Sequence, residues 1–495
     1  MEERKSETKA KVVEEEEEVS FDVDLCIVGS GPNALTVLSG LQEPFAKLSP
    51  ADFNRAVNNL HRRSNKDKRK AERKVLVLSP SGKWLNNWEH RFDELEITHL
   101  RSPVSAHPDM FSQESLMEFA HERGRSNELI DVGVRKNIGT TTMRINEVDE
   151  GLFDIPSQRL FMDFCMNLST KLPHDIVPGT VLSIDKADNG VVVRFSGSNG
   201  SVQRVLAQNV VLAIGAPGKC NVPSLIRSRV PEELRVHTSD FVRLGELKRN
   251  DTIQKEKILV VGGGLSAVQA AIAFSKKKAA HVTLASRRPL QWRHFDFPLQ
   301  WFDRRYMRRH FFEFYGTKME QRPEFIKKAR GGGTVPWWYR NQLQDSDVEH
   351  VTANITDVEY IGESGSVIVT LNDRKIEVDR VVLGTGSSKD CLSIPLIADL
   401  QSKFPVDILG GFPLIEEDLR WCKHLRNVFV VGGLASLRVG PSAANLMGAR
   451  RAAETIVQSL GAYEDLADEK GANVRTNPYS ALFGSDDDEE SSDDE

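Results

Sequence analysis

The sequence lacks long hydrophobic runs and contains few cysteines. No apolar stretch approaches the ~18 residues that a helix needs to span a bilayer, and the N-terminal MEERKSETKAKVVEEEEE has no apolar core of the kind found in signal peptides. The five cysteines are odd in number and include no C-x-x-C pair. We therefore expect no membrane span, no disulfide framework and no dithiol relay, and we expect a reducing, cytoplasmic compartment.

Two further chemistries also lack support. No spacing of histidines and cysteines is typical of a zinc site, so we expect no metal. The stretch GLSAV at 264–268 departs from the G-x-S-x-G nucleophile elbow at its last position, which argues against hydrolase chemistry.

Charge is unevenly distributed along the chain. The last eleven residues, SDDDEESSDDE, carry eight acids and no base, and without them the net charge of −6 becomes nearly neutral. The chain therefore shows no electrostatic footprint for general nucleic-acid binding. We expect residues 1–20 and 466–495 to be disordered acidic tails that bind protein partners or are phosphorylated at Ser485, Ser491 and Ser492, with a purely solubilising role as the alternative.

A basic run, HRRSNKDKRKAERK, occupies residues 61–74. We favour a solvated, partly helical insertion at about 50–73. The alternative is a nuclear-import or anion-binding patch, which would add the nucleus to the expected cytoplasmic location.

The body of the chain repeats one plan. An apolar strand, DLCIV, runs into the glycine-rich GSGPNA and a helical pattern; much later KILVV runs into GGGLSA and another helical pattern. Each unit continues through short alternating stretches typical of antiparallel strands, and each ends in an apolar strand followed by glycine, NVVLAIGAPG and DRVVLGTGSS. The alternation of strands and helices predicts an α/β fold with parallel sheets.

The first glycine loop has the spacing Gly29-x-Gly31-x-x-Ala34. Gly29 permits the tight turn, Gly31 lets the backbone approach a pyrophosphate, and Ala34 lets the helix pack closely on the strand. The acid that usually holds the ribose at the end of the next strand is missing, and Ser79 stands in its place. The alternative is that this loop is only a turn in an α/β sheet.

The second loop has the same spacing in Gly262, Gly264 and Ala267. At the end of its next strand stand Ser286, Arg287 and Arg288, about where the ribose would be read. An arginine there pairs with a 2′-phosphate, so this loop favours NADPH over NADH, with ordinary surface charge as the alternative.

These two loops predict two Rossmann-like dinucleotide-binding domains, the second inserted into the first. We expect a first segment of the FAD-binding domain at 21–245, the NADPH-binding domain at 246–387 and a second FAD-domain segment at 388–465. A chain that binds both a flavin and its nicotinamide reductant would hold the hydride donor and the hydride acceptor together.

The motifs of residues 22–460 resemble those of the two-dinucleotide-binding FAD- and NADPH-dependent monooxygenases, which include lysine and ornithine N-hydroxylases and flavin-containing monooxygenases. They include GSGPNA, WLNNWEHRFDELEITHLRSPVSAHPD, VVLAIGAPGKCNVP, GGGLSA with SRR, VVLGTGSS and FVVGGLASLRVGPSAANLMGARRAA. HLRSPVSAHPD is also similar to the oxidative-stress-induced growth inhibitor proteins. The Baeyer–Villiger fingerprint is absent, because only the region around His237 is kept.

The resemblance implies that NADPH reduces FAD and that dioxygen then forms a C4a-hydroperoxyflavin, which oxygenates a soft nucleophile such as an amine nitrogen or a sulfur. The alternative is an NADPH-oxidising flavoprotein without a hydroxylated product, acting as a peroxide-releasing oxidase or a redox-responsive regulator. A degenerate module that has lost FAD is a third, weaker reading.

The resemblance also places the segment around Arg101 near the flavin, and Arg101 is the best single candidate for a cofactor contact. The catalytic residues stay unknown, and residues 292–338 are interpreted as a packed helical excursion in which Gly331–Gly333 could alternatively hinge a lid. The expected cofactor-binding residues are Gly29, Gly31, Pro32, Asn33, Ala34, Ser79, Trp88, Arg101, Gly215, Gly262, Gly264, Leu265, Ser266, Ala267, Ser286, Arg287, Arg288, Gly386, Gly433, Pro441 and Asn445.

Overall fold

The computed structural model describes residues 19–42, 73–110, 112–132, 153–215, 218–298, 301 and 304–460. The expected tails, 1–20 and 466–495, and the basic insertion with its run 61–74 lie outside these residues except at their inner edges. None of the helices in the described ranges combines the length and the apolar character needed to cross a bilayer.

The first sheet has a parallel core of strands that are apolar on both faces. Ile27 and Val77, at its centre, are fully buried, which is the pattern of a parallel sheet covered on both sides. In spatial order its parallel strands are β5 (Asp175–Ala187), β2 (Val75–Ser79), β1 (Val19–Val28), β7 (Val202–Leu212) and β19 (Leu425–Val430), and β18 (Arg420–Cys422) adds an antiparallel edge.

Strands β5 and β7 continue beyond the parallel core. There β6 (Gly190–Gly197) pairs antiparallel with both of them, which closes a three-stranded layer. Two short antiparallel pairs lie outside this sheet: β3 (Leu129–Ile130) with β4 (Ile155–Pro156), and β16 (Ile408–Leu409) with β17 (Phe412–Pro413).

The second sheet is entirely parallel. Its spatial order is β11 (Val348–Thr352), β10 (His281–Ser286), β9 (Lys257–Val261), β15 (Arg380–Leu383) and β8 (Arg235–His237). A separate antiparallel layer follows β11 along the chain, and it consists of β12 (Ile355–Ile361), β13 (Ser366–Leu371) and β14 (Arg374–Val378).

These pairings confirm the predicted α/β fold. Each unit has a parallel sheet, an antiparallel layer and a strand that returns to the sheet, and β19 also returns to the first sheet. They differ from the sequence interpretation at one boundary. The first segment was expected to extend to 245, but β8 pairs with β15 in the second sheet. Three residues are too short to carry a hydrophobic pattern of their own, so only this pairing reveals where they belong.

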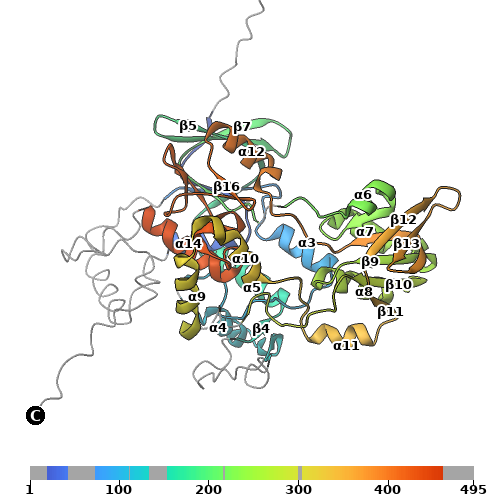
Figure 1. Cartoon of the computed structure of the whole chain (residues 1–495). Coiled ribbons are helices and arrows are strands. Elements are labelled where there is room, and N and C mark those ends of the chain that lie inside the picture. The colour runs from blue at the N-terminus through green and yellow to red at the C-terminus, as the bar shows by residue number, and fades with distance from the viewer. Residues whose placement is uncertain are drawn as a thin grey trace, which may run out of the picture.

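Helices accompany both sheets (Figure 1). The longest-range helix contact is between α1 and α14, which pack against each other although they lie at opposite ends of the described chain. The helices around the first sheet are α1 (Pro32–Gln42), α4 (Ser115–Glu122), α5 (Gln158–Ser169), α12 (Pro395–Lys403), α13 (Ser436–Val439) and α14 (Leu446–Ser459). Those around the second are α6 (Ser224–Arg229), α7 (Phe241–Arg249), α8 (Leu265–Lys276) and α11 (Trp338–Gln344), and α3 (Asn86–Glu94) lies between the two groups in Figure 1.

The aromatic stretch 292–338 forms the expected packed helical excursion. Its helices α9 (Arg304–Gly316) and α10 (Arg322–Arg330) surround a small core of their own, and Figure 1 shows both beside α14 rather than beside the second sheet. The core buries Phe295, Phe297, Trp301 and Phe311. This excursion therefore extends from the second sheet to the helix that ends the first domain.

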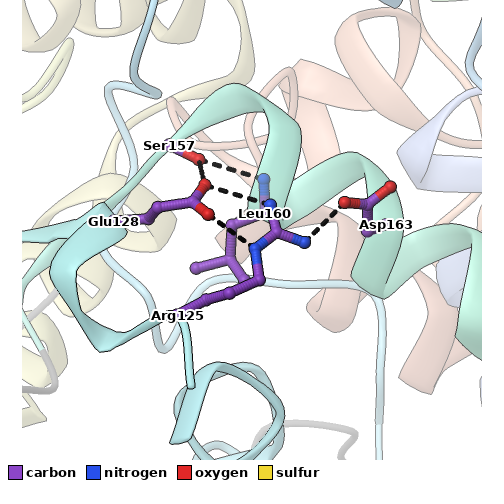
Figure 2. A network of polar contacts seen from close by, with 5 residues as sticks. All are labelled: Arg125, Glu128, Ser157, Leu160 and Asp163. Carbon is purple, nitrogen blue, oxygen red and sulfur yellow. Dashed lines mark hydrogen bonds and ion pairs between the residues drawn. The ribbon is translucent and has the colours of Figure 1, made fainter. Parts of the chain in front are cut away.

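A polar network supports the segment that leads to Arg101 (Figure 2). Arg125 donates from Nε and Nη2 to the two carboxylate oxygens of Glu128, at 2.6 and 3.0 Å, and from Nη1 to Asp163 Oδ2 at 2.5 Å. The Ser157 hydroxyl donates to Glu128 and accepts the Leu160 N–H at 3.0 Å, which caps α5. Because Gln158 N–H donates to Thr98 O, the capped helix end also fixes the chain just before Arg101.

Glu128→Gln tests this network. The hydrogen bonds from Arg125 hold the pKa of Glu128 below its ordinary value. The carboxylate therefore stabilises the fold fully above its unfolded pKa of about 4.3, and the stabilisation is lost as the pH falls through the lower folded value. In urea unfolding we expect the variant to be about 1–2 kcal/mol less stable than the native protein at pH 7. This difference in the free energy of unfolding should shrink as the pH falls below about 4.3.

Glu122→Gln, at an exposed position of α4, is the matched control, and we expect it to change stability by no more than about 0.5 kcal/mol. A difference between Glu128→Gln and the native protein that stays constant from neutral to acid pH would contradict the role given to the carboxylate.

Candidate functional site

Both glycine loops need their first glycine for the same steric reason. Gly29 has a φ of +108°, and a Cβ there would lie 2.4 Å from the carbonyl oxygen of Ala213. Gly262 has a φ of +148°, and a Cβ there would lie 2.3 Å from the carbonyl oxygen of Gly384. In each domain, the chain just after the returning strand packs directly on the glycine turn.

The third position of each fingerprint is a packing position. Ala34 and Ala267 are fully buried. A Cβ on Gly384 would lie 2.5 Å from the Cβ of Ala267, so the helix rests closely on the strand end. These two alanines therefore lie behind the site and do not line it.

Both loops open into one cleft with a volume of about 2120 Å³. Small-molecule pockets are usually about 300–1,000 Å³, so this cleft has room for more than one ligand. The loops reach it from the carboxyl ends of their strands, where ligands bind in open α/β sheets. The expected residues that line it are Gly29, Gly31, Pro32, Asn33, Ser79, Trp88, Arg101, Gly215, Gly262, Gly264, Leu265, Ser266, Ser286, Arg287, Arg288, Gly386 and Asn445.

Gly433 and Pro441, like the two alanines, do not line the cleft. Gly433 is buried in the short 3-10 helix Gly432–Ala435, and its neighbour Gly432 is the glycine that approaches the side chain of Asn33. Pro441 contributes its carbonyl oxygen, which accepts a 3.1 Å hydrogen bond from Arg330. From the C-terminal segment the cleft is lined instead by Ala444, Asn445 and Leu446.

The first loop carries polar atoms that lack partners. The Ser79 hydroxyl is buried at the end of β2, and neither it nor Asn33 Oδ1 has a hydrogen-bond partner among the described residues. An unpaired buried polar atom costs about 1–3 kcal/mol, and both residues line the cleft beside Gly31. A ribose hydroxyl would donate to Asn33 Oδ1, and a phosphate or ribose oxygen would accept from the Ser79 hydroxyl, so these residues fit FAD.

Two arginines after the second loop have no ion-pair partner among the described residues. Arg287 and Arg288 are exposed at the end of β10, and no ion pair or hydrogen bond from either guanidinium to a described residue is present. The Ser286 hydroxyl donates to the carbonyl oxygen of Arg288 at 2.8 Å, and this hydrogen bond fixes the turn that carries the two arginines. Two guanidinium groups at the ribose-reading position fit the 2′-phosphate of NADPH.

His237 joins the end of β8 to the turn around Gly386. Ser239 N–H donates to Nδ1 at 3.1 Å, so Nε2 carries the proton and donates to the carbonyl oxygen of Gly386 at 3.0 Å. Burial lowers the pKa of His237. The neutral imidazole is thus a fixed structural element of the cleft wall at neutral pH.

Arg101 lines the cleft and is hydrogen-bonded to a neighbouring segment of the chain. Its three guanidinium nitrogens donate to the carbonyl oxygens of Arg293, His294, Phe295 and Thr334, and to Thr334 Oγ1 at 2.5 Å. Burial lowers the pKa of Arg101 to about 10, while nearby Asp296 acts in the opposite direction. We infer that Arg101 positions the 293–296 and Thr334 segments that line the cleft.

A second group of cleft residues was missed by sequence reasoning. Asn445 Nδ2 donates to both carboxylate oxygens of Asp296, at 2.9 and 3.0 Å, and Asn445 Oδ1 accepts from Arg330 at 3.2 Å. Asp296 and Arg330 both fall in the aromatic stretch, and nothing in their local sequence marks them. Among the lining residues Asp296 is the single acid, beside five arginines, namely Arg91, Arg101, Arg287, Arg288 and Arg330.

Comparison with known proteins supports the fold described above. A family model for pyridine nucleotide-disulphide oxidoreductases matches residues 173–310. A search of curated proteins finds no match.

Several solved structures share the fold over most of their length. The ornithine N-hydroxylase of Kutzneria sp. 744, solved with reduced FAD, NADP⁺ and L-ornithine, has a TM-score of 0.64 at 17% identity, over 90% of this chain and 100% of that one. The FAD-bound cadaverine monooxygenase of Erwinia amylovora has 0.60 at 16%, over 88% and 94%. The L-lysine 6-monooxygenase of Pseudomonas syringae has 0.58 at 19%, over 88% and 99%. The fold that the sequence resemblance implied is therefore confirmed.

Arg101→Ala tests the positioning role of Arg101. The substitution leaves several buried carbonyl oxygens without donors, and we expect it to lower the free energy of unfolding by roughly 3 kcal/mol, with flavin affinity falling in parallel. Urea unfolding and FAD titration measure the two effects. Arg426→Ala, at an exposed position of β19, is the control and should leave both unchanged. Unaltered stability with a selective loss of flavin binding would instead identify Arg101 as a direct cofactor contact.

Proposed function

We propose that the protein is a FAD- and NADPH-dependent monooxygenase that oxygenates a soft nucleophile, an amine nitrogen or a sulfur. The observation that carries the proposal is the shared cleft: two glycine loops from two domains open into it, and each presents unpaired groups that complement a different dinucleotide. A chain that binds only one nucleotide would have no need for two such loops facing the same space.

The residues divide between the two cofactors. Gly31, Asn33 and Ser79 would hold FAD, and Gly264, Arg287 and Arg288 would hold NADPH. When bound, NADPH supplies hydride and FAD accepts it and activates dioxygen. The chain contributes binding and orientation, and its wide cleft brings both cofactors into one space with a small-molecule substrate.

The N-terminus of α14 is the chain's own means of stabilising negative charge. Asn445 stands at the N-cap position, but its side chain bonds Asp296 and Arg330 and makes no cap hydrogen bond. The first N–H groups of the helix therefore remain free of a side-chain cap at the cleft wall. With the helix dipole they would favour an anionic group at that place, such as reduced flavin.

A second candidate function rests on Asp296. The solved structures described above act on ornithine, cadaverine and lysine, which carry cationic amines. Here Asp296, the one acid among the described residues of the cleft lining, is already bonded to Asn445 and lies near Arg101, Arg293 and Arg330. Within the described part of the lining, no further carboxylate is present to receive an ammonium group of the substrate. This arrangement disfavours a substrate with a second cationic amine, and the alternative of an NADPH-oxidising flavoprotein that releases peroxide without a hydroxylated product stays the second candidate.

The domain boundaries remain part of the proposal. We place the FAD-binding segments at 19–215 and 388–465 and the NADPH-binding domain between them, with its first strand at β8. The cytoplasmic location and the role of the acidic tails stay predictions from the sequence.

Spectra and product analysis test the proposed function. We expect the purified protein to absorb as a flavoprotein, to oxidise NADPH in preference to NADH, and to form hydroxylated product when amines and thioethers are screened. Peroxide should be followed in the same reactions. Peroxide in one-to-one ratio with NADPH for every candidate substrate would favour the oxidase, and protein that cannot be reconstituted with FAD would exclude both functions.

Arg287→Ala tests the nucleotide assignment. Loss of a charge-assisted contact with the 2′-phosphate costs about 1.5–3 kcal/mol, so we expect the KM for NADPH to rise roughly 10- to 100-fold and the KM for NADH to stay the same. Steady-state kinetics with both nucleotides measure the difference. Lys277→Ala, which removes an exposed cation beyond the end of α8, is the matched control. An equal change for both nucleotides would refute the assignment.

A further inference from the structure

The two glycine loops differ at their second glycine. A Cβ on Gly31 would meet nothing within 4 Å. A Cβ on Gly264, the equivalent position, would lie 3.5 Å from the Cα of Gly333. The contact is tight from the other side as well, because a Cβ on Gly333 would lie 2.9 Å from the Cα of Gly264 and 3.2 Å from its nitrogen.

The second glycine is the point where the backbone approaches the pyrophosphate, which is why a side chain is not tolerated there. The direction of its missing Cβ therefore marks the space that the phosphates need. This space is open at the first loop and is occupied by the chain's own backbone at the second.

The covering segment, Gly331–Gly333, is weakly attached along its own length. Gly331 has a φ of +68°, and Cβ atoms on Gly331 and Gly332 would meet nothing within 4 Å. All three glycines are exposed, and among the described residues no acceptor is found for the N–H groups of Gly332 and Gly333. Apart from the contact with Gly264, nothing described holds the middle of this segment in place.

Its two ends, by contrast, are anchored to the first domain. On one side the Arg330 side chain donates to the Pro441 carbonyl and to Asn445 Oδ1, at 3.1 and 3.2 Å. On the other side Thr334 accepts hydrogen bonds from Arg101 at its carbonyl and hydroxyl oxygens. Three glycines between two fixed points can move away from Gly264 without breaking either anchor.

We propose that Gly331–Gly333 is an internal cover over the NADPH phosphate turn and that NADPH binds by displacing it. The proposal rests on the proposed function only in taking the Gly262–Gly264 loop as the NADPH site. Because binding needs the open form, the apparent affinity for NADPH is reduced by the fraction of molecules in which the cover is open. The anchors at Arg330 and Thr334 further link this opening to residues of the flavin side of the cleft.

Gly333→Ala provides the decisive variant, because its methyl group cannot be accommodated while the segment rests on the Gly264 backbone. The substitution therefore favours the open form, and we expect the Kd for NADP⁺ to fall roughly three- to tenfold. Isothermal titration of the FAD-loaded, full-length protein with NADP⁺ measures it. Gly332→Ala is the matched control, since its methyl group enters open space, and its Kd should equal that of the native protein.

A segment that covers the NADPH site and a segment that grips the bound nucleotide predict opposite changes in the Kd for NADP⁺. If the free N–H groups of the segment gripped the pyrophosphate, Gly333→Ala would weaken NADP⁺ binding, and that result, or an unchanged Kd, would overturn the proposal. Gly331→Ala is a second variant that creates no clash and disfavours the closed backbone at φ +68°. It should also tighten binding, so the proposal stays testable if Gly333→Ala does not fold.

Failure of the cover and failure of the proposed function give different results. The cover alone would be refuted if the native protein binds FAD and NADP⁺ but neither Gly333→Ala nor Gly331→Ala binds NADP⁺ more tightly. Native protein that binds no NADP⁺ would refute the assignment of the second loop, on which both proposals rest.

Discussion

The hydrogen bonds of one arginine hold the cleft in shape. Arg101 reaches from the first domain to three consecutive backbone carbonyls at 293–295 and to Thr334. Those segments carry Asp296 and lead to the Gly331–Gly333 cover, so the wall of the cleft depends on them. Burying a guanidinium is costly, and the cost is offset here because carbonyl oxygens replace the water that the cation loses.

The electrostatics of the cleft suit the nucleotides that we propose it binds. Among the described residues five arginines and one acid line it, and each glycine loop leads into a helix N-terminus, where backbone N–H groups attract anions. Dinucleotides carry phosphate charges that match such a surface. The same excess of positive charge opposes a cationic amine unless Asp296 is freed from Asn445, and it therefore bears on the substrate as well as on the cofactors.

Much of the fold and part of the site could be read from local patterns. The apolar strands before each glycine loop, the short alternating stretches and the glycines themselves are properties of a few neighbouring residues, and the structure places them as expected. The boundary at β8 could not be read in this way, because three residues acquire their place only by pairing with β15, more than 140 positions later. Gly433 and Pro441 show the same limit on a smaller scale, since a turn can be located by its glycine or proline while the direction that each residue faces depends on packing.

Arg101 lines the cleft as its motif implied, and the structure adds protein partners that the sequence did not indicate. Its position beside the cleft follows from the motif in which it lies, but its hydrogen bonds join residues separated by up to 233 positions. No periodicity or spacing records such contacts.

The sequence by itself determined the two glycine loops, their order and the pair of arginines after the second, because backbone freedom at glycine and charge at a strand end are local properties. Only the tertiary structure decided that both loops share one cleft, that the Ser79 hydroxyl and Asn33 Oδ1 find no partner among the described residues, and that Gly333 lies on Gly264. The reason is physical: which polar atoms find partners and which surfaces are covered depends on segments that meet only after the chain has folded.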